Sequence, residues 1–228
     1  MSGRPSGLIE SACIETGQGE ETTPGHDATS SERKARIAIE QQRLRAWAEA
    51  NGKLKGKLPR EDFRGGEHTV QTPGNAERAN ARIIKATRPD ANQGYGIAYG
   101  SYSQGATPSE YLDRLSTQNR IFDDDVVLER IVPVGNKLSI VTSQPFIKGR
   151  GATASEIDRF MREKGFEKIG EGTFHHLGEG LLVHDLAPKN AKVSESGIIH
   201  PIDPVIQRVT PEFAHDLKMH PIHPIVSR

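Results

Sequence analysis

Four polar residues in the last quarter of the chain have the types and spacing of a reaction site. His184 and Asp185 end one short apolar run, Asn190 lies five residues after Asp185, and Asp203 ends a second apolar run thirteen residues later. Carboxylate and amide oxygens are the ligands that Mg²⁺ prefers in proteins, and a carboxylate can also orient or deprotonate a hydroxyl group. These residues therefore predict a magnesium site beside a carboxylate that acts on a hydroxyl acceptor.

The two apolar runs that flank these residues predict a pair of strands. Residues 181–183 and 198–202 are apolar, and the polar stretch between them contains Pro, Asn and Gly, which is typical of a loop. We expect this strand–loop–strand hairpin to bring Asp185, Asn190 and Asp203 to one end.

The order of these residues resembles the catalytic hairpin of the protein-kinase-like superfamily. It is most similar to the compact kinase domain found in polyvalent proteins of phages and conjugative elements. The resemblance implies that Asp185 is the base or substrate orienter and that Asn190 and Asp203 ligate Mg²⁺. No Arg stands between His184 and Asp185, and Pro204 rather than Phe-Gly follows Asp203. These departures are nearer to the small-molecule phosphotransferases of the superfamily than to regulated protein kinases.

The resemblance extends to a nucleotide-binding half upstream. Gly65 and Gly66 precede a short strand and would form the loop over the phosphates, because glycine lets backbone N–H groups approach them closely. Lys85 lies inside the apolar strand predicted over residues 81–87, as does the lysine that pairs the α- and β-phosphates in the family. A plain turn and an exposed edge lysine are the alternatives.

A helix is predicted to open at Thr107, where Thr107 and Glu110 form a capping-box pattern with Pro108 in the first turn. The resemblance implies that the Glu110 carboxylate pairs with Lys85. In the alternative, the capping box uses the same carboxylate on the backbone N–H of Thr107.

The elements that must position these residues follow from the remaining pattern. Residues 126–132 and 138–142, joined through Gly135-Asn136, predict a β-hairpin, which gives four strands with one helix inserted after the second. Residues 143–147 would then form a hinge in which Gln144 and Phe146 supply groups for binding adenine. A second capping-box helix is predicted over residues 153–164.

We therefore expect an α+β protein with a minimal bilobal kinase-like fold. An antiparallel β-sheet N-lobe with one inserted helix would precede a reduced C-lobe that holds the catalytic hairpin. The expected divisions are a disordered leader (1–30), an amphipathic helix and basic linker (31–60), the N-lobe (61–142), and the hinge and C-lobe (143–228). A short helix around residues 211–218 would end the chain, which leaves little room after Asp203 for a peptide-docking lobe.

Composition excludes several other classes of protein. Lys plus Arg and Asp plus Glu both number 30 among 228 residues, so no overall charge favours nucleic acid or membrane. A single cysteine, Cys13, excludes an internal disulfide framework. The chain has no apolar run of the roughly 20 residues that a transmembrane helix needs and no signal-peptide pattern. We expect a cytoplasmic protein.

The sequence thus predicts a phosphotransferase that uses ATP and Mg²⁺ and transfers the γ-phosphate to a hydroxyl of a protein Ser, Thr or Tyr or of a small molecule. One alternative is a catalytically inactive, nucleotide-binding pseudokinase or interaction module. The other is a nucleic-acid-associated accessory protein of a mobile element. It would use the basic segment between Lys53 and Arg64, although the neutral composition does not favour it.

Overall fold

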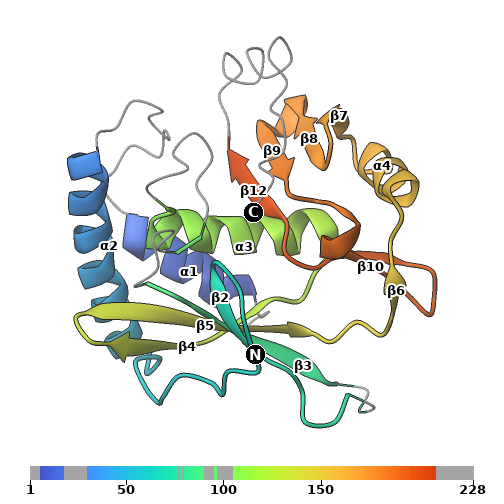
Figure 1. The fold of residues 1–228 in the computed structure, drawn as a ribbon. Coiled ribbons are helices and arrows are strands. Elements are labelled where there is room, and N and C mark those ends of the chain that lie inside the picture. The colour runs from blue at the N-terminus through green and yellow to red at the C-terminus, as the bar shows by residue number, and fades with distance from the viewer. Residues whose placement is uncertain are drawn as a thin grey trace. The chain divides into compact units, whose positions relative to one another are not determined.

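The chain folds into two compact units, Met1–Phe146 and Ile147–Arg228 (Figure 1). The structure is a computed structural model and describes residues 6–17, 30–76, 78, 80–89, 95–96 and 105–208. The helix predicted around residues 211–218 lies outside the described residues. Among the described helices, none is long and apolar enough to cross a membrane.

The first unit is built on a five-stranded antiparallel sheet with the order β1-β2-β3-β5-β4. Its strands are β1 (Phe63–Arg64), β2 (His68–Gln71), β3 (Arg82–Thr87), β4 (Val127–Val134) and β5 (Lys137–Pro145). One helix, α3 (Pro108–Phe122), is inserted between β3 and β4. The four predicted strands and the inserted helix are therefore present, and the fold is the expected α+β type. The two-residue β1 was not predicted, because a strand this short leaves no readable alternation.

Two further helices complete the core of the first unit. They are α1 (Ser6–Gly17) and α2 (Ser30–Ala50), and both pack against α3. Figure 1 shows α3 running across the sheet with α1 beside it. The prediction of a disordered leader is wrong for residues 6–17, since Ile9 and Ala12 of α1 are fully buried in the main core cluster. Ile9 and Ala12 have the three-residue spacing of a helix face, but polar residues stand between them and make this spacing hard to recognise in the sequence.

The second unit contains one helix and two small antiparallel sheets. The helix is α4 (Ala154–Glu163). One sheet has the order β12-β9-β8-β7 and the other β11-β10-β6. The strands are β6 (Gly149–Gly151), β7 (Glu167–Gly170), β8 (Thr173–His176), β9 (Leu181–His184), β10 (Ala191–Ser194), β11 (Ile199–Pro201) and β12 (Val205–Arg208). Two short 3₁₀ helices, η1 (Leu177–Glu179) and η2 (Pro188–Asn190), complete it.

The predicted hairpin between the two apolar runs is wrong in its pairing. β9 pairs with β8 and β12, whereas β11 pairs with β10 in the other sheet. The stretch read as a polar loop contains β10, in which buried Ala191 and Val193 alternate with half-buried residues. A tight turn with Gly197 at φ 82° then returns the chain to β11. β11 pairs with β10, which is nearer in the chain than β9, because closing a short loop costs less conformational entropy than closing a long one.

Candidate functional site

Asp185 and Asn190 are held together directly after β9. The Asn190 side-chain Nδ2 donates to the Asp185 backbone oxygen at 2.7 Å and to Asp185 Oδ2 at 2.9 Å. Lys189 Nζ lies 3.4 Å from the other carboxylate oxygen. The Asp185 side chain remains 44% exposed, so it is open to a substrate. The sequence predicted that these residues lie at one end of a hairpin, and here the short helix η2, which ends at Asn190, brings the two together.

Asp185 has an unusual backbone conformation. Its φ is 55°, in the left-handed region, where Asp is one of the few non-glycine residues found with any frequency. Just after it, the Leu186 N–H donates to the Gly172 backbone oxygen at 3.1 Å, and Gly172 packs so closely on Leu186 that an added Cβ would lie 3.3 Å from its oxygen. Strained residues of this kind concentrate at functional sites.

Asp203 lies at the same end of the β9–β12 strand pair as Asp185. β9 ends at His184, which pairs with Val205 at the start of β12. Asp185 follows β9 by one residue, and Asp203 precedes β12 by two. The Ile202 N–H also donates to the Asn190 backbone oxygen at 2.8 Å. The β9–β12 pairing therefore brings the backbone positions of all three residues to one end of these strands, and the predicted hairpin does not form.

The donor set around Asn190 fits a hard divalent cation. Both of its side-chain hydrogen bonds to Asp185 use Nδ2, so the amide oxygen is the atom left to accept or ligate. No protein partner of that oxygen occurs among the described residues. An amide oxygen and carboxylates such as that of Asp203, two residues before β12, are the ligand types that Mg²⁺ prefers.

Lys85 occupies the middle of the sheet in the first unit. It lies on β3 between Val70 of β2 and Thr142 of β5, and its side chain is only 8% exposed. Paired residues of antiparallel strands share a face, so Lys85 lies on the same face as Leu128 and Ile140, which belong to the core beneath the helices. The alternative of an exposed edge lysine is wrong.

Glu110 does not have the predicted role in this structure. Its carboxylate accepts from the Thr107 backbone N–H at 2.8 Å, in a complete capping box, and it pairs with Arg33 of α2 at 2.5 Å. The capping-box alternative is what the structure shows, and the pairing with Lys85 is not present among the interactions of Glu110. Local capping and a cation from α2 together occupy the carboxylate.

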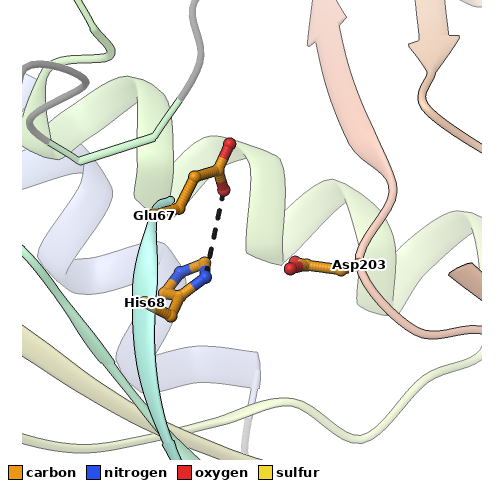
Figure 2. Close-up of side chains that lie close together, drawn as sticks. All are labelled: Glu67, His68 and Asp203. Atoms are coloured by element: carbon orange, nitrogen blue, oxygen red, sulfur yellow. Dashed lines mark ion pairs between the residues drawn. The ribbon is translucent and has the colours of Figure 1, made fainter. Parts of the chain in front are cut away.

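α3 forms a different ion pair with the first unit, in which the helix supplies the cation and the residue before β2 supplies the carboxylate. In the predicted pair the helix supplied the carboxylate and the strand supplied the cation. Arg114 of α3 donates to Glu67, which precedes β2, at 2.9 Å, and the two side chains are 5% and 12% exposed. Next along the chain, His68 Nε2 lies 2.9 Å from the Tyr111 hydroxyl. Figure 2 shows Glu67 and His68 at the start of β2, with Glu67 Oε2 3.9 Å from His68 Nδ1, and it also draws Asp203 from the segment before β12. Sequence reasoning missed this cluster, because nothing in the local pattern of α3 marks Arg114 as inward-facing.

Gly65 and Gly66 form the tight turn between β1 and β2. Arg64 pairs with Thr69, and the Gly65 N–H donates to the His68 oxygen at 2.8 Å. Neither glycine has a positive φ, and a Cβ on Gly65 would meet only the His68 oxygen at an ordinary 3.6 Å. The fold itself therefore does not demand glycine at position 65.

The predicted hinge residues belong to the first unit. β5 continues to Pro145, so Gln144 lies within the sheet opposite Ile83. The Phe146 N–H donates to the Ala81 oxygen at 2.8 Å. The boundary of the unit falls after Phe146 rather than after residue 142, because the strand is longer than its apolar run.

The basic segment is less cationic than its sequence suggests. Arg60 pairs with Asp62 at 2.7 Å and Arg64 with Glu61 at 2.8 Å. Hydrogen bonds from Arg60 and Thr72 hold the pKa of Asp62 well below its usual range, so that carboxylate stays charged. Two of the five basic side chains are thus neutralised within the segment, which weakens the nucleic-acid alternative.

Comparison with known proteins identifies a family for this chain. No match was found among curated proteins or among solved structures. A family model described as a serine/threonine/tyrosine kinase found in polyvalent proteins matches residues 38–210. The match covers most of the chain, and it includes the sheet, α3 and the Asp185–Asn190–Asp203 set. The chain therefore belongs to the family of kinases found in polyvalent proteins, and it is a kinase-like protein of α+β fold.

Proposed function

We propose that this protein is a phosphotransferase that uses ATP and Mg²⁺ to phosphorylate a hydroxyl acceptor. The observation that carries the proposal is the arrangement of Asp185, Asn190 and Asp203 at one edge of the β9–β12 pair. The family match supports phosphotransfer in general. The acceptor is a protein Ser, Thr or Tyr, or a small molecule.

The proposal gives a separate role to each of three residues in the second unit. Asp185 orients the acceptor hydroxyl and receives its proton, for which its exposed carboxylate is suited. Asn190 holds Asp185 in place through Nδ2 and offers its amide oxygen, with the Asp203 carboxylate, to Mg²⁺. The bound cation would neutralise charge on the phosphate oxygens, which supplies much of the rate in phosphoryl transfer.

The first unit supplies the nucleotide-binding residues. Lys85 lies in the middle of the sheet and is mostly buried. Binding of Lys85 to the non-transferred phosphates follows the family pattern. Gly65 and Gly66 cover the phosphates, a role supported by the fact that the fold itself does not require glycine at position 65. Gln144 and the carbonyl of Phe146 are the groups proposed for adenine binding.

The test is incubation of the purified chain with γ-labelled ATP and Mg²⁺, followed by mass spectrometry for added phosphate and measurement of released ADP. Asp203→Asn is expected to abolish both signals. Asp158→Asn, in an exposed aspartate of the same unit that pairs with Lys168, should retain them. Equal activity in the two variants would contradict the role of Asp203.

A second candidate is a nucleotide-binding module without turnover. The occupied Glu110 carboxylate favours it, because Glu110 pairs with Arg33 and with the Thr107 N–H instead of taking the role that the helix glutamate has in active members of the superfamily. Mg²⁺-dependent ATP binding with neither ADP release nor phosphate transfer would establish this second function. The absence of both binding and turnover would exclude both candidates.

A further inference from the structure

The loop that carries Gly65 and Gly66 is fastened to α3 by a buried ion pair. Glu67, the last residue of the loop, accepts from Arg114 at 2.9 Å. The two side chains are 12% and 5% exposed, and 47 residues separate them in the chain. A pair shielded from water in this way is little screened by salt. It therefore fixes the position of the loop end with respect to the helix.

A second contact beside the first makes the attachment directional. His68 Nε2 and the Tyr111 hydroxyl are 2.9 Å apart and both residues are buried. Tyr111 and Arg114 are three positions apart, so they lie on one face of α3. Two consecutive residues of the β1–β2 connection thus meet one face of a helix, and the loop cannot rotate about a single bond.

The ion pair is also enclosed from above by a glycine. Gly96 has φ 111°, and a Cβ there would lie 3.1 Å from Glu67 Oε2 and 3.3 Å from the Arg114 guanidinium. A side chain at this position would crowd the pair and would also strain the backbone, which has a positive φ. The Gly96 backbone oxygen accepts from the Ala106 N–H at 2.7 Å, just before α3, which keeps this cover in place.

The loop is held at its other side by the end of β3. Arg88 donates from its guanidinium to the Gly65 oxygen at 2.6 Å and from its backbone N–H to the Glu67 oxygen at 3.0 Å. Glycine loses more conformational entropy on ordering than any other residue. A glycine loop that is already fixed on both sides binds a ligand without that loss.

We propose that Arg114 is a positioning residue for nucleotide binding: through Glu67 it holds the Gly65-Gly66 loop in the conformation that receives the phosphates. This inference rests on the proposed function. In this inference Arg114 acts on the loop and does not itself contact the nucleotide, whereas Lys85 is proposed to bind the phosphates directly.

The test compares Arg114→Met with Arg33→Met. Arg33 also forms a partly buried ion pair with α3, to Glu110 at 2.5 Å, and within the described part of the chain it makes no hydrogen bond or ion pair with the loop. Hydrogen–deuterium exchange of residues 65–71 without nucleotide, taken relative to that of β5 (Lys137–Pro145) in the same protein, is expected to accelerate about tenfold or more in Arg114→Met and to stay near wild type in Arg33→Met. The KM for ATP should rise about tenfold to a hundredfold in Arg114→Met, with kcat changed less, because misplaced binding groups cost binding first.

The double variant Arg114→Met/Glu67→Met separates positioning from general stability. It removes both charges of the buried pair together, so the midpoint of urea unfolding should recover toward wild type, while the raised KM and fast loop exchange should persist. Recovery of all three quantities, or equal loop exchange in Arg114→Met and Arg33→Met, would overturn the inference. If the wild type does not bind ATP, the proposed function fails, but the exchange measurement still decides whether Arg114 holds the loop.

Discussion

The helices α3 and α4 begin with the same local pattern but stand in different surroundings. In each, a threonine N-cap and a glutamate three residues later form a capping box. The glutamate accepts from the threonine N–H at 2.8 Å in both, and the return bond to the threonine hydroxyl is 3.3 Å in both. An arginine lies 2.5 Å from the carboxylate in each case.

The two arginines differ in origin and in exposure. Arg150 lies six residues from Glu156 and is 59% exposed, whereas Arg33 comes from α2 and is 8% exposed. Arg33 also donates to the Gly105 oxygen at 2.8 Å. Beside it, the fully buried Glu40 accepts from the Ser109 N–H at 2.8 Å. The capping box of α4 therefore lies beside an exposed arginine. The capping box of α3 also holds α3 against α2 through Arg33.

The largest expected effect separates the two arginines. Arg33→Met should lower the free energy of unfolding of the first unit by about 2–3 kcal/mol, because it leaves the partly buried Glu110 carboxylate without its cation. Arg150→Met should leave the second unit near wild type, since exposed pairs contribute little. Urea unfolding followed by circular dichroism measures both. Similar losses in the two variants would show that exposure does not distinguish the helix starts.

A medium effect is expected from the threonines, because each hydroxyl caps its helix in the same way. Thr107→Ala and Thr153→Ala should each cost about 1 kcal/mol, with the same urea measurement as readout. Thr107→Ser and Thr153→Ser, which keep the hydroxyl, should restore most of the loss. A much larger loss at Thr107 that serine does not restore would mean that packing of the buried methyl group, rather than capping, stabilises α3.

The smallest effect is a pH dependence at α4. Hydrogen bonds from Arg150, and then from the Thr153 N–H, hold the pKa of Glu156 well below its ordinary value of 4.5. A depressed folded-state pKa means that the contribution is complete above pH 4.5 and is lost as the pH falls toward the folded-state value. Amide protection factors at the start of α4, measured by NMR at pH 6 and pH 3, should fall in the wild type. In Glu156→Gln they should be lower at pH 6 and should change less between the two pH values.

Much of the local structure of both units could be predicted from the sequence. The capping boxes, the inserted helix and the β4–β5 turn at Gly135-Asn136 are local signals, and the structure contains each of them. The Asp185–Asn190 spacing likewise predicted a pair that the structure joins by a hydrogen bond. Short-range geometry is fixed by a few φ and ψ angles, so caps and turns can be recognised from the residues that form them.

Long-range choices could not be predicted in this way. Glu110 could pair with Lys85 or cap its own helix, and the burial of Arg33 beside it decided between them. Asp203 comes to the edge beside Asp185 through β12, a strand that the apolar pattern did not identify, rather than through β11. Arg114 faces inward because Glu67, distant in the chain, offers it a carboxylate away from water.

The amino-acid sequence by itself determined which residues are candidates for a reaction site and where α3 and α4 begin, since residue chemistry and helix caps depend on neighbours within a few positions. Only the tertiary structure decided the partners of Glu110 and Arg114, the burial of α1 and the strand that carries Asp203. The physical reason is that desolvation and strand pairing depend on which distant segments compete for the same contact, and a single chain pattern does not contain the outcome of that competition.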